Sequence, residues 1–154
     1  MCIRDSDTSA KIRLAWALRR QGKHSLELGK YQSILTEHPA HLLALSGTAT
    51  SLARMGRLGE ARDTFDALQI LAPVHPLTET TAATLEAIQG RDDLAIESLS
   101  RAVVGQEHLD TELQIEFRQD LALDPALARV RKSTRLRSML RRTLGAAAPR
   151  SYRQ

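Results

Sequence analysis

Three histidines are the first candidates for chemistry, because imidazole is the side chain used most often in acid–base catalysis and metal binding. His41 and His75 occupy the same position of a repeating pattern described below, and His38 stands shortly before His41. No cysteine or patterned carboxylate accompanies them, so a tetrahedral metal site would lack ligands. We therefore expect solvated histidines in turns, with no bound metal.

The remaining polar residues form no recognisable catalytic set. Asp92 and Asp93 suit the start of a helix, where carboxylates cap amide groups. The glycines follow neither the GxGxxG nor the GxxxxGK pattern of a phosphate cradle. We predict that the chain is not an enzyme and that it uses no cofactor and no small-molecule substrate.

The elements that must position these residues follow a 34-residue period. Gly22, Gly56 and Gly90 are spaced by this interval. Glycine permits the positive φ that ends a helix, so each one predicts a turn between two paired helices. The same interval separates Pro39 from Pro73. It also separates the members of three further sets of equivalent positions, which we call columns: Ala15, Ala49 and Ala83; Tyr31, Phe65 and Leu99; Ile34, Leu68 and Ala102.

This pattern resembles the tetratricopeptide repeat (TPR), a 34-residue helix-turn-helix. The three repeats would span 8–41, 42–75 and 76–109, and the second fits best. In the first, Leu26 and Glu27 look transposed relative to the family pattern, which predicts a local shift of that helix. The resemblance implies an all-α fold, a right-handed α-α superhelix (TPR solenoid) of three repeats with C-terminal capping helices.

Apolar spacing also predicts the individual helices. Thr8 or Ser9 is expected to cap the first helix. Asp92, or the turn before Asp92, is expected to cap the sixth helix. A seventh helix would follow the cap Asp110, with Leu109, Leu113, Phe117 and Leu121 along one stripe. The six earlier helices are expected at about 9–21, 24–37, 41–54, 58–71, 76–89 and 92–104.

The two ends of the chain fall outside the repeats. Residues 1–6 resemble a translated adapter and are expected to be non-native, so that an upstream part of the protein would be missing. Residues 110–144 would form a helical cap with a basic face, and 145–154 a disordered tail. The capping apolar residues would be Leu121, Leu123, Leu127, Val130, Leu136, Met139 and Leu140.

The TPR resemblance implies a concave groove that binds a protein or peptide partner. Trp16 could be an aromatic anchor there or a packing residue, and the arginines could pair with acidic side chains. The groove residues carried over from the family are Arg13, Trp16, Arg20, Ser46, Thr50, Arg54, Thr80 and Thr84.

Charge is divided unevenly along the chain. Residues 1–124 contain 13 Lys or Arg and 18 Asp or Glu, whereas residues 125–154 contain 9 Lys or Arg and no acid. A solvated face of a capping helix is the favoured interpretation of residues 129–142, with nucleic acid, anionic membrane or the acidic repeats as alternative partners. The basic patch comprises Arg131, Lys132, Arg135, Arg137, Arg141 and Arg142.

Composition limits the remaining function classes. With 42% hydrophobic and 26% charged residues, the chain is typical of a soluble helical protein. It has no apolar stretch of membrane-spanning length, and its single cysteine, Cys2, fits a reducing compartment, so we expect a cytoplasmic protein. A scaffold is the favoured function; an accessory segment of a larger enzyme is a further alternative.

Overall fold

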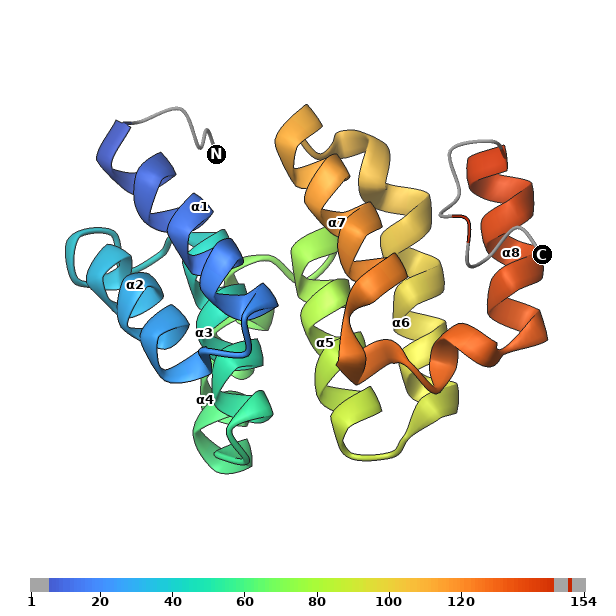
Figure 1. The fold of residues 1–154 in the computed structure, drawn as a ribbon, viewed down its shortest axis with the longest axis horizontal. Coiled ribbons are helices and arrows are strands. Elements are labelled where there is room, and N and C mark those ends of the chain that lie inside the picture. Colours follow the sequence, from blue (N-terminus) through green and yellow to red (C-terminus); the bar gives the residue numbers. More distant parts are fainter. Residues whose placement is uncertain (1–5, 146–149, 151–154) are drawn as a thin grey trace. The chain divides into compact units, whose positions relative to one another are not determined.

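All the secondary structure of the described chain is helical (Figure 1). The computed structural model describes residues 6–145 and residue 150. They fall into two compact units, one ending at Thr81 and one beginning at Ala82, and each is considered by itself. The predicted all-α class is therefore confirmed over the described residues. The predicted non-native start and disordered tail lie almost entirely outside them.

In the first unit each helix packs against the next one along the chain, α1 on α2, α2 on α3 and α3 on α4. The helix α5 begins in this unit and continues into the second. The bounds are α1 Ser6–Arg20, α2 His24–Glu37, α3 Leu42–Arg54, α4 Leu58–Leu71 and α5 Pro76–Ile88.

The helix bounds recur at the same interval as the glycines. The helix α5 begins and ends one repeat period after α3, and the helix α4 begins and ends one repeat period after α2. The helix α6 (Asp92–Gly105) continues the series at the same interval from α4. The sequence period therefore corresponds to a repeated pair of helices.

The turn inside each pair is also the same. Gly22, Gly56 and Gly90 have φ of 72°, 79° and 78°. The residue after each glycine donates its amide proton back across the helix end, as Arg57 does to the Leu52 carbonyl at 2.9 Å. This hydrogen bond belongs to the Schellman ending of a helix, which requires the left-handed backbone that glycine adopts without strain.

One predicted helix cap is wrong, and of the two alternatives predicted for the sixth helix the structure has the preceding turn and not Asp92 at the cap position. The helix α1 begins at Ser6, so Thr8 and Ser9 are buried in its first turn instead of preceding it. At the start of α6 the cap position belongs to Arg91, whose side chain makes no capping hydrogen bond with the described residues. The carboxylate of Asp92 instead accepts hydrogen bonds from Arg129.

The predicted local shift of the second helix does not occur. The helix α2 keeps the bounds that the period requires. Glu27 occupies the fully buried position that Ala61 and Ala95 hold in the later repeats, while Leu26 is 58% exposed. The first repeat therefore encloses a carboxylate where the others enclose a methyl group.

The second unit adds a helix, three short 3-10 turns and a final helix to the α5–α6 pair. Asp110 caps α7 as predicted, since its Oδ1 accepts the amide proton of Leu113 at 3.0 Å. The helix α8 packs on α6, with the turn η3 beside both. The bounds are η1 Gln106–His108, α7 Thr111–Leu123, η2 Pro125–Leu127, η3 Val130–Lys132 and α8 Thr134–Leu144.

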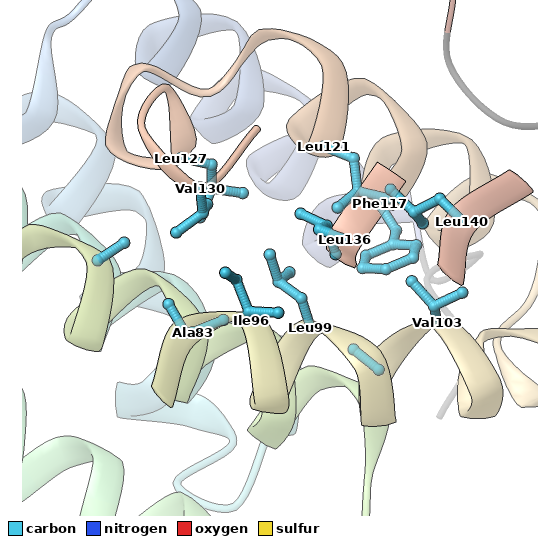
Figure 2. Close-up of a cluster of buried hydrophobic side chains, with 13 residues drawn as sticks. Ala83, Ile96, Leu99, Val103, Phe117, Leu121, Leu127, Val130, Leu136 and Leu140 are labelled. Atoms are coloured by element: carbon cyan, nitrogen blue, oxygen red, sulfur yellow. The ribbon is translucent and has the colours of Figure 1, made fainter. Parts of the chain in front are cut away.

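The core of the second unit explains why the chain continues past the third repeat. Figure 2 shows Leu136 and Leu140 of α8 meeting Phe117 and Leu121 of α7 above Leu99 of α6. The predicted cover for the end of the repeats is thus present. One member of the predicted set is wrong, because Leu123, in the last turn of α7, is 69% exposed.

A close contact joins α2 to α3. Gly47 lies in the interior of α3, and a Cβ atom built on it would overlap the ring atoms of Tyr31, which is fully buried in α2. The ring has no room to move away, because a packed core allows little adjustment. Gly47 therefore lets these two helices approach closely.

Replacing Gly47 with Ala should destabilise the fold by about 1 to 3 kcal/mol through overpacking, despite the better helix propensity of Ala. Gly29, inside α2, is the matched control because no described atom lies within 4 Å of its Cβ position. Gly29→Ala should leave the protein as stable or stabilise it by up to about 1 kcal/mol. Urea unfolding of both variants checks this, and equal effects would contradict the packing of Tyr31 on Gly47.

Candidate partner-binding surfaces

The helix α1 presents two of the predicted groove residues to solvent. Arg13 and Arg20 are exposed and lie two helical turns apart, which is about 10 Å along a helix. Ala17 stands between them on the same side of the helix and is half-buried. Two guanidinium groups with a short residue between them can receive two carboxylates of one ligand.

Trp16 does not share this exposure. Only 7% of its surface is accessible, so it is a buried packing residue in α1. This agrees with the packing interpretation of the residue and gives no support to an exposed aromatic anchor.

The two hydroxyl groups of α3 that were predicted to line the groove, those of Ser46 and Thr50, are engaged within the first unit. Ser46 and Thr50 are buried. The hydroxyl of Ser46 lies 2.7 Å from that of Thr81 at the start of α5. The hydroxyl of Thr50 donates to the carbonyls of Ser46 and Gly47, one turn earlier in its own helix. These side chains therefore stabilise the helices and offer a ligand little hydrogen-bonding capacity.

The third repeat contributes two threonines that the TPR pattern also assigned to the groove. Thr80 is half-buried, and its hydroxyl donates to the Pro76 carbonyl of its own helix. Thr84 is buried and belongs to the second unit.

Arg54, the last predicted groove cation, is half-buried at the end of α3 and has a role inside the fold. Burial raises the pKa of Glu27, while a hydrogen bond to His24 and the positive charges of Arg54 and Arg19 oppose that rise. The Nδ1 atom of His24 lies 3.1 Å from Oε2 of Glu27. Arg54 thus helps to compensate a buried carboxylate, which costs free energy when it is uncompensated.

The basic patch divides into two groups with different roles. Arg131 donates hydrogen bonds to the carbonyls of Leu121, at 3.0 Å, and Asp124, at 2.7 Å, and so caps the end of α7. Arg137 donates to the Arg131 carbonyl at 3.1 Å. These two arginines hold the capping segment together.

Arg129, which precedes the patch, fixes the capping segment to the α5–α6 turn. Its Nη2 atom donates to the Ala87 carbonyl at 2.6 Å and lies 3.1 Å from Oδ1 of Asp92. The hydrogen bond with Asp92 raises the pKa of the guanidinium. From the sequence, Arg129 was expected only to contribute to a basic face. Its pairing with Asp92 was not predictable, since nothing in the sequence relates the two residues.

The other patch residues are exposed or half-exposed at the surface. Lys132 ends η3, and Arg135, Arg141 and Arg142 lie on α8. None of these four side chains forms a hydrogen bond or ion pair within the described part of the chain. We call these four residues the basic face.

The histidines have a structural role that the sequence did not predict. His41 and His75 are half-buried and not fully solvated, and each stands just before a helix. The Nδ1 atom of His41 accepts the amide proton of Ala44 at 3.3 Å, and that of His75 accepts the amide proton of Leu77 at 3.1 Å. Both imidazoles therefore cap helices, α3 and α5, as neutral acceptors.

Neither a metal centre nor a membrane-spanning segment is found among the described residues. Over residues 6–145 no three His, Cys, Asp or Glu side chains gather closely enough to hold a metal ion. No helix in the same range combines the length and the apolar character needed to cross a bilayer.

Comparison of the chain with models of known protein families, with curated proteins and with solved structures gives no significant match.

The histidine caps predict how stability depends on pH. Burial lowers the pKa of His41 from 6.5, with a further contribution from His38, and burial also lowers the pKa of His75 from 6.5. Because the unfolded chain then binds protons more readily than the folded chain, stability is complete above about pH 6.5 and falls below it. Protonation at Nδ1 also removes the acceptor of each capping bond.

Asn is the informative replacement, because it caps helices well and does not titrate. Thermal melts between about pH 7.5 and about pH 5.5 should show a smaller loss of Tm for the His41→Asn/His75→Asn variant than for the wild type. His108→Asn is the control, since His108 is exposed, and it should follow the wild type. A double variant that loses as much Tm as the wild type would contradict the capping role.

Proposed function

We propose that this chain is a TPR-type scaffold, a right-handed solenoid of helix pairs with no catalytic activity of its own. In this proposal it binds a peptide or a helix of a partner protein along α1 of its first unit. The observation that carries the proposal is the recurrence of helix bounds and glycine turns at one constant period. Arrays of such pairs characteristically present a binding surface built from the first helix of each pair.

The exposed side chains of α1 indicate the chemistry of the ligand. Arg13 and Arg20 supply two positive charges about 10 Å apart. Leu14, which follows Arg13 in the sequence, is 46% exposed and can contact an apolar side chain. A suitable ligand has two acidic residues spaced by about three positions in an extended peptide, or by about seven in a helix.

Specificity in this proposal comes from the arginines. The hydroxyls of Ser46 and Thr50 already have partners in the first unit, so they contribute little to recognition. Arg54 is left out of the binding set as well, because its replacement would also remove a charge that compensates Glu27.

Selection from a library of random peptides, followed by affinity measurement on the selected sequences, tests the proposal. The selected peptides should be acidic, and Arg13→Gln/Arg20→Gln should weaken their binding about 10-fold to 100-fold, since hydrogen bonds to charged groups contribute about 1.5 to 3 kcal/mol.

Lys23→Gln/Lys30→Gln is the matched control, because these two cations have the same spacing, with Lys23 at the N-cap of α2 and Lys30 in the middle of that helix. This variant should bind the selected peptides as tightly as the wild type does. Failure to select any acidic peptide, or an equal loss in both double variants, would reject α1 as the binding surface. Both double variants must melt at the same temperature as the wild type, so that a change in binding does not reflect unfolding.

A further inference from the structure

The final helix separates its apolar and basic side chains completely. Leu136 and Leu140 of α8 have no accessible surface, because they lie in the core that they share with Phe117 and Leu121 (Figure 2). The exposed side of the same helix bears Arg135, Ser138, Arg141 and Arg142. The helix is therefore held in place by one side and presents only polar groups on the other.

The arginines of this segment are also separated by role. Arg129, Arg131 and Arg137 are engaged with Asp92 or with backbone carbonyls of the second unit. The basic face, Lys132, Arg135, Arg141 and Arg142, has no such partner among the described residues and no acidic residue anywhere in positions 125–154. Like charges brought together without compensation repel one another, so an anionic ligand would lower the electrostatic free energy of this surface.

We infer that the basic face binds the phosphate backbone of double-stranded nucleic acid, independently of base sequence. Guanidinium groups pair with phosphate oxygens through two parallel hydrogen bonds, and the exposed hydroxyls of Thr134 and Ser138 can donate to the same backbone. A helix with its side chains is about 10 to 12 Å wide, which matches a major groove about 12 Å wide.

The composition of α8 favours a duplex over the other anionic ligands. Its sequence TRLRSMLRRTL contains no aromatic residue on which unpaired bases could stack. Its apolar side chains are buried in the protein core, so they cannot insert into a lipid bilayer as those of an interfacial helix do.

Fluorescence anisotropy with a short, labelled duplex of random sequence measures this binding. Four neutralised phosphates give a slope of about −3.6 in a plot of log K against log salt, so affinity should fall about 100-fold between about 50 mM and about 200 mM salt. Arg135→Gln/Arg141→Gln/Arg142→Gln leaves one cation of the basic face, and its slope should be about −0.9. Glutamine is a good helix former, and a thermal melt checks that α8 remains folded.

Lys11→Gln/Lys23→Gln/Lys30→Gln removes the same charge from the first unit and should keep the affinity and slope of the wild type. A single strand of the same sequence, vesicles containing phosphatidylserine, and sedimentation of the protein alone at low salt complete the experiment. The inference is overturned if the duplex does not bind at low salt or if both triple variants lose affinity equally. Tighter binding to the single strand or the vesicles, or self-association through α8 and the acidic residues of positions 82–124, would also overturn it.

Discussion

Each helix pair depends on one backbone conformation, the left-handed turn that ends its first helix. Only glycine adopts this conformation without steric cost, and Gly22, Gly56 and Gly90 adopt it with nearly the same φ. Because the turn fixes where one helix ends and the next begins, the bounds of the helices repeat as regularly as the glycines. In the first unit the two pairs then pack against each other through α2 and α3, since a helix pair of this length has no core of its own.

Deviations from the repeat are compensated by neighbouring side chains. Tyr31 is the largest residue in its column and lies against Gly47, which has no side chain. Glu27 replaces the Ala of later repeats, and the cost of burying its carboxylate is partly offset by His24 and by two arginines. Such local compensation keeps the helices in register although the sequence of the first repeat departs from that of the others.

The second unit uses charge in two ways. Arginine side chains reach carbonyls at the ends of α5 and α7 and donate hydrogen bonds to these backbone acceptors. Other arginines of the same segment remain at the surface of α8. The capping segment is thus fixed to the repeats by hydrogen bonds and a shared apolar core, and its excess positive charge is displayed on one side.

Much of this organisation was predictable from the sequence. The glycine period predicted both bounds of α2 and α4, and the stripe from Leu109 to Leu121 predicted α7. Side-chain pairings between distant parts of the sequence were not predictable, because these pairs do not recur at the 34-residue interval.

Asp92 was one of two candidates for the cap of α6, the other being the preceding turn, and it instead binds Arg129, far along the chain in the capping segment. Gly47 stands where the other repeats have Arg13 and Thr81, so only its contact with Tyr31 explains it. Of the predicted groove residues, Arg13 and Arg20 are exposed, whereas the burial of Ser46 and Thr50 depends on neighbours that a helix pattern cannot specify.

Backbone NMR of the full chain tests the repeated turn most directly. Carbon chemical shifts should end helices at residues 20, 54 and 88 and begin them at residues 24, 58 and 92. Three-bond couplings should give positive φ at Gly22, Gly56 and Gly90, with slowly exchanging amides at Lys23, Arg57 and Arg91. Helix ends that depart from the common interval, or negative φ at these glycines, would contradict the repeat on which the whole account depends.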